Sequence, residues 1–322
     1  MIFVDRTLYP KGELLSPVLD ENTWEQISNA SAEGTGKNYW SVGDCKKIHV
    51  EGVIGRSKDP DYPVWDGTGS NLEINQDFFV FIIGFDHNSA LEGNGIVFQC
   101  FKSSLGNGIN VKNDVALIDS LYNSDSDIGA WFTIFHPNAN QYLRKKPGLG
   151  WKYSDIRYDI LGSTDIRMDD ATPNTPINPV PDTLMSALPL DLRSVMKPMT
   201  IYSNTRPEAD TSLPLVSASI DYLPLLSEYE ACGDYRNPEE IEYQKVYEYY
   251  QAIDDREEIN GITDPIKFAH NDLSTAVTWL TRTGINNSSY WVCMRADDDN
   301  ESGSFSGDFV NRSYGISPVF KV

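Results

Sequence analysis

The C-terminal stretch 276–322 constrains the fold most, because apolar, β-rich runs alternate in it with turn-forming segments. The runs span 276–283, 290–295 and 314–322, and Gly, Asn, Asp and Ser are frequent between them. β-Branched and aromatic residues bounded by turn formers are typical of strands joined by loops. Because a hydrophobic strand at an exposed edge promotes aggregation, we expect the C-terminal strand to dock in a sheet and close the core.

The composition indicates a chain with a substantial core and many loops. Of its 322 residues, 40% are hydrophobic and 11% aromatic, which is too apolar for a disordered protein. The 18 prolines and 23 glycines are spread widely, and this favours an α+β or mostly β protein over a helical bundle. We expect an N-terminal arm, residues 1–22, and a single domain, residues 23–322.

The charge balance excludes some partners. With 26 basic and 47 acidic residues, the net charge of −21 repels phosphate backbones and anionic membranes. No apolar run approaches the length of a membrane span. The start of the chain lacks a basic segment followed by an apolar one, so we expect no signal peptide and assembly in the host cytoplasm. That expectation is compatible with a particle released by lysis.

Several elements can be placed from local patterns. Thr23 and Gln26 form a capping-box pattern at the start of a short helix. Residues 39–50 alternate as a strand pair around a Gly43-Asp44 turn, and 77–85 is the most apolar run, typical of a buried strand. We expect further strands at 96–101, 192–203 and 222–229, and helices or helical turns at 113–122, 150–162, 184–192 and 238–254.

Large aromatic side chains are the expected core of such a loop-rich chain. Arg157 is expected to bond backbone carbonyls or a buried carboxylate such as that of Asp221. The predicted core residues are Trp24, Trp151, Arg157, Trp279, Trp291 and Phe320.

The order of eight short segments resembles an uncharacterised domain family of gut Firmicutes and their phages. The segments are TWEQIS, YWSVGDCKKI, GFDHN, GWKYSDIRYDIL, SVMKP, DYLPLLSEYE, TWLTRT and YGISPVF. The family is similar to the C-type-lectin-like and sulfatase-modifying-factor-like folds. The resemblance implies an α+β, C-type-lectin-like fold with twisted antiparallel strands, two or three short helices and long loops. Loop insertions are expected near 55–75 and 163–182.

The chain departs from the family pattern in two segments. Thr281 and Thr283 stand within the segment where the family tends to have Leu-Arg-Ser. Ile316-Ser317 stands where the family tends to have Val-Arg, and because Ser317 replaces the arginine we expect a buried ion pair to be lost there.

Catalytic signatures are absent from the sequence, and we predict a protein without enzymatic activity. It contains no GxSxG, Walker-type loop, GxGxxG after a strand or HExxH pattern. The four cysteines lie far apart in the sequence and lack the spacing of metal ligands, so structural zinc is not expected. The sequence does not decide whether two of them form a disulfide. The sulfatase-modifying relatives are oxidases with a reactive cysteine pair, and here Cys232 and Cys293 could lie near one another and supply it.

Loops of the C-terminal stretch carry the candidate ligand surface, because their Asn, Asp, Ser and Gly residues with interspersed aromatics resemble paratopes. Oxygen-rich loops also hold calcium, although this one lacks EF-hand spacing and a solvated turn is the alternative. The candidate calcium ligands are Asp297, Asp299 and Glu301, and no other cofactor is expected. The candidate ligand-binding residues are Trp65, Asp297, Asp298, Asp299, Asn300, Phe305 and Asn311.

Together these features predict a non-enzymatic virion protein of a phage, with a structural or adhesive role. It would be a head-decoration, tail or fibre component that attaches to a host-surface glycan. The arm, residues 1–22, would dock on other virion subunits and make the protein a homo-oligomer, without nucleic acid or membrane as a partner. The alternatives are a bacterial carbohydrate-binding surface module and a formylglycine-generating-type oxidase.

Overall fold

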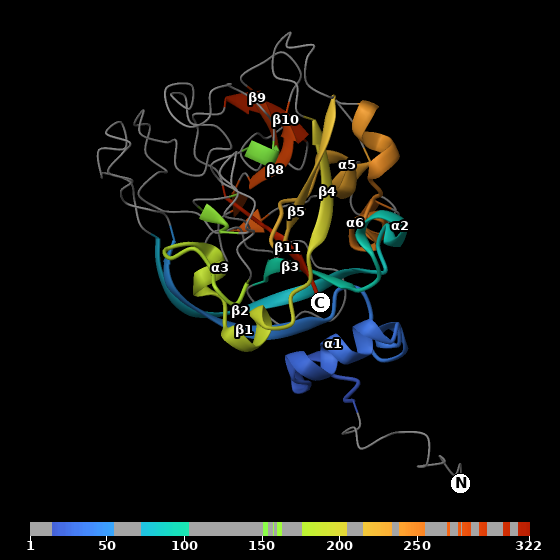
Figure 1. The fold of residues 1–322 in the computed structure, drawn as a ribbon, viewed down its shortest axis with the longest axis vertical. Coiled ribbons are helices and arrows are strands. Elements are labelled where there is room, and N and C mark those ends of the chain that lie inside the picture. Colours follow the sequence, from blue (N-terminus) through green and yellow to red (C-terminus); the bar gives the residue numbers. More distant parts are fainter. Residues whose placement is uncertain are drawn as a thin grey trace.

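The chain is mixed α/β, with a curled antiparallel sheet and few, short helices (Figure 1). All the strand pairs named below are antiparallel. The coarse expectation of an α+β protein is therefore confirmed. The computed structural model describes residues 15–54, 72–102, 151–153, 157, 160–162, 176–204, 215–233, 238–254, 269–270, 276–277, 279–284, 290–294, 305–309 and 315–322.

The largest sheet has the strand order β1-β2-β3-β11. Its strands are β1 (Cys45–Ile54), β2 (Leu72–Phe85), β3 (Ile96–Lys102) and β11 (Val319–Lys321). The strands predicted at 77–85 and 96–101 are confirmed, and both faces of β2 are buried between Val80 and Ile83.

The strand pair predicted at 39–50 is wrong. Only β1 lies there, and its partner is β2, with Cys45 opposite Phe81. Residues before β1 turn instead, because Gly43 has φ 92° and its N–H donates to the carbonyl of Ile82. The turn residues thus position β1 on a distant strand rather than folding it onto its neighbour.

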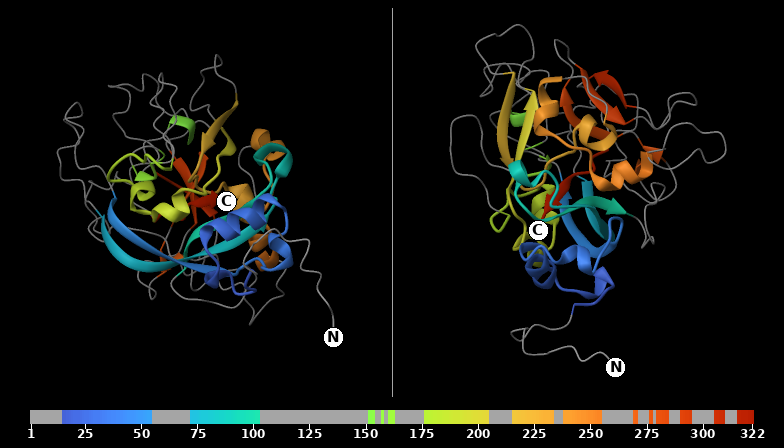
Figure 2. Two further views of the ribbon diagram at one scale, coloured as in Figure 1. Left: turned by 60° about the horizontal axis from the view of Figure 1, so that its bottom comes forward. Right: turned by 90° about the vertical axis from the view of Figure 1, so that its right-hand side faces the viewer.

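The helix α1 (Trp24–Ala32) begins at the predicted capping box, which is confirmed. The ring of Trp24 meets the rings of Phe98 and Phe320 edge to face, at centroid distances of 5.4 and 5.9 Å. Phe320 is fully buried, so the prediction that the C-terminal strand closes the core is confirmed. In Figure 2, α1 lies against the outer side of the curled sheet, close to the C-terminus.

Residues 15–22, which the sequence assigns to the arm, pack on the domain. The 3-10 helix η2 (Leu19–Glu21) lies on β1, and Leu19 is buried. The Asp20 carboxylate accepts from the Lys47 N–H at 2.6 Å, and the Trp40 indole donates to the Ser16 carbonyl at 3.1 Å. The rest of the predicted arm, residues 1–14, lies outside the described residues.

A second group of elements lies on the other side of β11 (Figure 1). It includes the pair β4 (Met199–Asn204) and β5 (Val216–Asp221), and a sheet of order β10-β9-β8. The latter strands are Phe305–Phe309, Tyr290–Met294 and Trp279–Gly284. A further pair joins β6 (Ala269–His270) to β7 (Ala276–Val277).

Two predicted elements in this group are wrong. Residues 222–229 do not form a strand, because Ser227 caps the helix α5 (Glu228–Cys232) through its hydroxyl and the Glu230 N–H. The predicted helix 238–254 is broken into the 3-10 helix η9 (Pro238–Tyr243) and α6 (Glu248–Asp254). The helix predicted at 113–122 lies outside the part of the chain that the structure describes.

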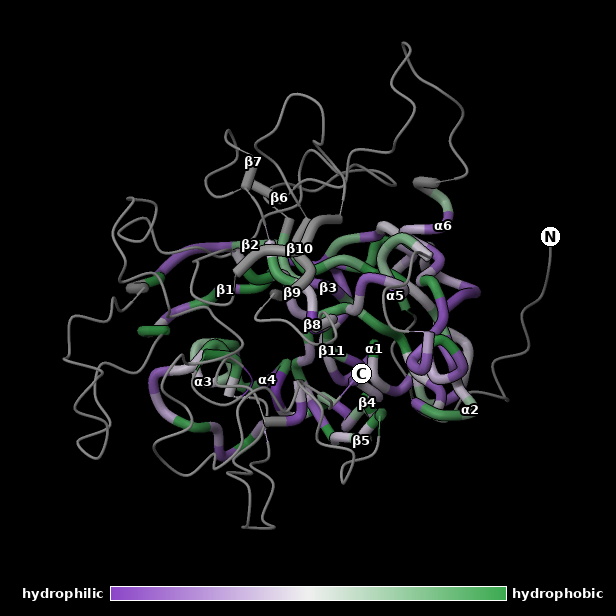
Figure 3. Tube along the Cα trace, turned by 90° about the horizontal axis from the view of Figure 1, so that it is seen from above, coloured by the Kyte–Doolittle hydropathy of each residue, from purple (hydrophilic) through white to green (hydrophobic). Residues whose placement is uncertain are grey.

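The remaining helices are single turns. They are α2 (Ser89–Glu92), α3 (Leu184–Ala187), α4 (Leu190–Arg193) and the 3-10 helices η3 (Gly36–Asn38) and η7 (Trp151–Tyr153). The described residues thus form six α-helices rather than two or three, because helices of four or five residues are too short to show a 3.6-residue period. Seen from above, β3, β8 and β11 lie near the centre of the molecule (Figure 3).

Candidate functional site

Most of the predicted ligand-binding residues lie outside the described residues. This holds for Trp65, Asp297, Asp298, Asp299, Asn300 and Asn311, and for the candidate calcium ligand Glu301. Phe305 is the first residue of β10 and pairs with Met294 of β9, so it belongs to a strand rather than to a loop. Across the described ranges, no group of three or more His, Cys, Asp or Glu side chains could hold a metal ion.

Five of the predicted core residues are buried: Trp24, Trp151, Arg157, Trp279 and Phe320 are each at most 3% exposed. The backbone of Trp291 lies in β9, beside Asp308 of β10. The predicted partner of Arg157 is confirmed, since its Nε donates to the Asp221 carboxylate at 2.5 Å. Its other nitrogens donate to the carbonyls of Lys152 and Ile220, at 2.8 and 2.9 Å. Arg157 therefore ties η7 to β5.

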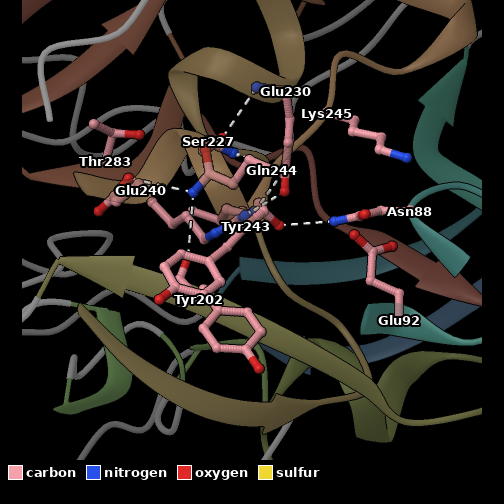
Figure 4. Close-up of polar contacts among 12 residues, drawn as sticks. Asn88, Glu92, Tyr202, Ser227, Glu230, Glu240, Tyr243, Gln244, Lys245 and Thr283 are labelled. Atoms are coloured by element: carbon pink, nitrogen blue, oxygen red, sulfur yellow. Dashed lines mark hydrogen bonds and ion pairs between the residues drawn. The ribbon is translucent and has the colours of Figure 1, made fainter. Parts of the chain in front are cut away.

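A buried polar cluster, which the sequence did not reveal, connects β8, α5, η9 and β4. Figure 4 shows its members Ser227, Glu230, Glu240 and Gln244. We define it as Ser227, Glu230, Glu240, Gln244 and Arg282, all at most 4% exposed. Its members come from distant parts of the chain, so the fold alone brings them together.

The ion pair of Arg282 with Glu230 is the strongest contact of this cluster. Arg282 lies on β8 and donates through both terminal nitrogens to the two Glu230 oxygens of α5, one bond measuring 2.6 Å. Such fork-to-fork pairing is strong and fixes geometry. Burial by itself lowers the pKa of Arg282, but the facing Glu230 carboxylate outweighs burial and holds that pKa above its usual value.

Glu240 is the second carboxylate of the cluster and lies on η9. One of its oxygens accepts from the Asn204 N–H at the end of β4, and the other accepts from the Gln244 amide at 3.3 Å. Burial raises the pKa of Glu240 to about 7, although its hydrogen bonds and the Arg282 charge oppose that rise. Desolvation of the carboxylate therefore outweighs the partners that favour it.

Gln244 joins the carboxylates to the backbone. Its amide nitrogen also donates to the Tyr202 carbonyl at 3.2 Å, and its oxygen accepts from the Ser227 hydroxyl at 2.7 Å. Ser227 in turn caps α5, where the Ser227 N–H donates to Glu230 at 3.0 Å. One side chain thus links β4, η9 and α5.

The adjoining pair of His87 and Glu92 lies at α2, where both side chains are at most 5% exposed. His87 Nδ1 is 3.1 Å from a Glu92 oxygen, and Nε2 is 2.9 Å from the Lys245 carbonyl. Because a carbonyl oxygen only accepts, Nε2 carries a proton. The hydrogen bond between Nδ1 and the Glu92 oxygen then requires a second proton, on one of those two atoms. Burial raises the pKa of Glu92, and its hydrogen bond to His87 opposes the rise.

The backbone around this pair is held in unusual conformations. Asp86 and Asn88 have φ of 51° and 42°, in the left-handed region that non-glycine residues rarely adopt. The Asn88 amide donates to the Tyr243 carbonyl at 2.7 Å, which places GFDHN against the end of η9. The Lys321 ammonium donates to the Glu92 carbonyl, so β11 is tied to the same turn.

His87 and Arg282 both make several contacts within the protein. Both His87 nitrogens are engaged, and the Tyr247 ring stacks on the imidazole at a centroid distance of 3.5 Å. The Arg282 guanidinium is enclosed between Glu230 and the Leu225 carbonyl, to which it donates at 2.7 Å. Both side chains are buried in this arrangement.

Of the two cysteines that an oxidase would need, Cys232 and Cys293, the structure describes the side chain of Cys232 only. Cys232 is half-buried at the end of α5, and its thiol donates to the Glu228 carbonyl at 3.1 Å. The side chain of Cys293 lies outside what the structure describes. Cys100 is fully buried in β3, and burial raises the pKa of its thiol well above the usual value.

Comparison with protein-family models, with curated proteins and with solved structures finds no match to this chain. The family resemblance of the eight segments therefore stays a prediction.

The sequence contained one usable signal for the cluster. Ser227 and Glu230 have the S-x-x-E spacing of a capping box, which predicts a helix start. Arg282 and Glu240 had no local signal, because a buried ion pair depends on which distant elements meet.

Proposed function

We propose that this chain is a non-enzymatic structural and adhesive protein of a phage or prophage-derived particle, with a C-type-lectin-like fold. One observation supports it best. In the described core, Arg282 pairs with Glu230 and His87 contacts Glu92, and the first of these pairs joins distant segments of the chain. A framework stabilised in this way suits a protein that presents its surface to partners.

The proposed ligand surface is formed by the connections that flank β9 and by the segment around Trp65. Glycan recognition is the proposed activity, through the carboxylates and amide of Asp297–Asn300 with Phe305 and Asn311, and with calcium at Asp297, Asp299 and Glu301. Carboxylates and amides accept and donate to sugar hydroxyls, and aromatic faces stack on sugar rings. The described residues contain no helix that is both long and apolar enough to cross a membrane.

The proposed arm is restricted to residues 1–14, because 15–22 pack on β1. It would dock on a neighbouring virion subunit and produce an oligomer. Deleting residues 1–14 should leave the domain folded, since the Asp20 and Leu19 contacts stay, while incorporation into particles is lost. A deletion variant that assembles normally would refute this role of the arm.

Adhesion is tested by binding to host cell walls and to a glycan array, with and without calcium. Replacing Asp297 and Asp299 by Asn should abolish calcium-dependent binding, and Glu242→Gln, which removes one exposed charge from η9, is the control. Glycan binding by a protein absent from particles would favour a bacterial carbohydrate-binding module. Thiol oxidation activity that is lost in Cys232→Ala would favour the oxidase.

A further inference from the structure

The turn between α2 and β3 contains a glycine that packing requires. A Cβ on Gly95 would lie 2.8 Å from Cγ of Lys321 and 2.9 Å from the Val322 carbonyl oxygen, both in the C-terminal segment. Because a Cβ does not approach other atoms so closely, the lack of a side chain at Gly95 lets β11 lie against this turn. The residue before it, Asn94, is exposed, so the turn presents an Asn-Gly pair to solvent.

An Asn-Gly pair is chemically labile. The backbone nitrogen of the second residue can attack the side-chain amide carbon of the asparagine, and a glycine has no Cβ that hinders the closing ring. The nitrogen attacks only after it has given up its proton. A hydrogen bond that holds this N–H, above all one to a negatively charged acceptor, therefore slows the attack.

Asp86 holds the N–H group of Gly95 in this way. The Asp86 carboxylate accepts from the Gly95 N–H at 3.1 Å, and the Asp86 N–H donates to the Gly95 carbonyl at 2.8 Å. While it makes both bonds, Asp86 has a φ of 51°, in the left-handed region that non-glycine residues rarely adopt. The two reciprocal bonds give this unusual backbone conformation a role.

We propose that Asn94 is a site of spontaneous deamidation, and that the contact of Asp86 with the Gly95 N–H limits its rate. In the first step the Gly95 nitrogen forms a bond to Cγ of Asn94. The bond from Cγ to the side-chain nitrogen breaks, and this nitrogen leaves as ammonia with the proton from Gly95. Water then opens the cyclic imide, at Cγ to give aspartate or at the main-chain carbonyl to give isoaspartate. Water is the only co-reactant, and no group is oxidised or reduced.

Both products change the turn where it meets the C-terminal segment. Each adds a negative charge, and isoaspartate also inserts a methylene group into the main chain directly before Gly95. The next residue, Ile96, donates its N–H to the Val322 carbonyl at 3.2 Å and accepts from the Val322 N–H at 3.1 Å. Amide hydrogen exchange at Ile96 and Val322 should therefore be faster in chains that contain isoaspartate at position 94 than in unmodified chains.

Peptide mass spectrometry tests the proposal on the whole chain, which is incubated at mildly alkaline pH and digested afterwards. Fragmentation locates the mass gain that accompanies replacement of the Asn94 amide by a carboxyl group, and chromatography separates the aspartate and isoaspartate peptides. Asp86→Gly should speed the conversion by roughly tenfold or more, because it removes the charged acceptor while glycine tolerates the left-handed backbone. Asp182→Gly is the matched control, since Asp182 also has a positive φ, of 57°, and makes no contact with Gly95. It should leave the rate unchanged.

Equal rates in the wild type and in Asp86→Gly, or no conversion of Asn94 in either protein, would overturn the proposal. Circular dichroism shows whether Asp86→Gly is folded. If it is not, Asp86→Asn decides, because asparagine keeps the shape of the side chain, tolerates the left-handed backbone and lacks the charge. Conversion in folded Asp86→Asn must be faster than in the folded wild type, and an equal rate refutes the role of Asp86.

Discussion

Asp221 offers the sharpest test of the core, because three donors converge on one buried carboxylate. The side chain is 0% exposed and accepts from Arg157 Nε at 2.5 Å on one oxygen. On the other oxygen it accepts from the Trp151 indole at 3.1 Å and the Ser219 hydroxyl at 2.8 Å. Asp221→Asn keeps the shape of the side chain but replaces one acceptor oxygen with a donor.

Either orientation of the new amide conflicts with the site. With its nitrogen toward Arg157, two donors face each other and a buried guanidinium loses its carboxylate. With its nitrogen toward Trp151 and Ser219, the indole loses its acceptor, the Ser219 hydroxyl has to turn and accept instead, and the charge of Arg157 is still unbalanced. Breaking a buried ion pair by changing one partner costs about 3–5 kcal/mol. We therefore expect the free energy of unfolding to fall by about that amount, a large share of the roughly 5–15 kcal/mol typical of domains.

Urea unfolding followed by tryptophan fluorescence measures this change. Asp77→Asn is the matched control, because Asp77 is 46% exposed and pairs with Lys47 and His49 on the surface. We expect no resolvable change there, since solvent screens exposed pairs. A double variant that combines Arg157→Met with Asp221→Asn should lose less than the sum of the two single variants. Additive losses, or a loss below about 1 kcal/mol for Asp221→Asn, would contradict the role of the pair.

Four further changes test local features by the same unfolding assay. Thr23→Ala removes the capping box and should cost about 1 kcal/mol. Gly162→Ala should cost about 2–4 kcal/mol, because φ is +65° and the new Cβ would lie 2.7 Å from the Thr183 Cβ. Gly34→Ala, with φ +67° and no atom within 4 Å, should cost only about 1–2 kcal/mol. Phe320→Ala should cost about 3–5 kcal/mol, and an unchanged unfolding midpoint would contradict its place in the core.

Features with a strong local signal could be predicted from the sequence. The run 77–85 is apolar on both faces, which predicts a buried strand. It forms the second half of β2. The Thr23 capping box depends on residues three apart, so tertiary context hardly alters it. The partnership of Arg157 with Asp221 followed from the need to satisfy a buried guanidinium.

Features that depend on contacts between distant segments could not be predicted from the sequence. Residues 238–254 have a helical stripe, yet the Tyr247 N–H bonds the Glu230 carbonyl and not the carbonyl four residues before it. That tertiary bond, with the buried Gln244 side chain, replaces the helical hydrogen bonds between η9 and α6. Residues 222–227 look like a strand because they are apolar, but they are buried as irregular chain that contacts Pro318 through Leu225.

Ser317 shows how this core does without the arginine that the family resemblance implies. Its hydroxyl donates to the Cys100 carbonyl at 2.5 Å and accepts from the Gln99 amide at 2.9 Å, so the position is satisfied by neutral groups. Buried guanidinium groups stand instead at Arg282, paired with Glu230, and at Arg157, paired with Asp221. Among the described residues the partners of Ser317 are neutral, so an arginine at 317 would lack a carboxylate from them.

The C-terminal residues 319–322 therefore join the largest sheet to the loop that contacts the polar cluster. On one side, the Val322 N–H and carbonyl exchange bonds with Ile96 of β3. On the other side, the Val319 N–H donates to the Pro224 carbonyl in the loop before α5. In the same loop, the Leu226 carbonyl accepts from the Arg282 N–H. Because both sets of bonds use a few consecutive residues, a change that displaces β11 must also displace the loop before α5. Loss of β11 packing should thus loosen the Arg282 pair before it affects the hairpin of β1 and β2, whose pairing does not involve this segment.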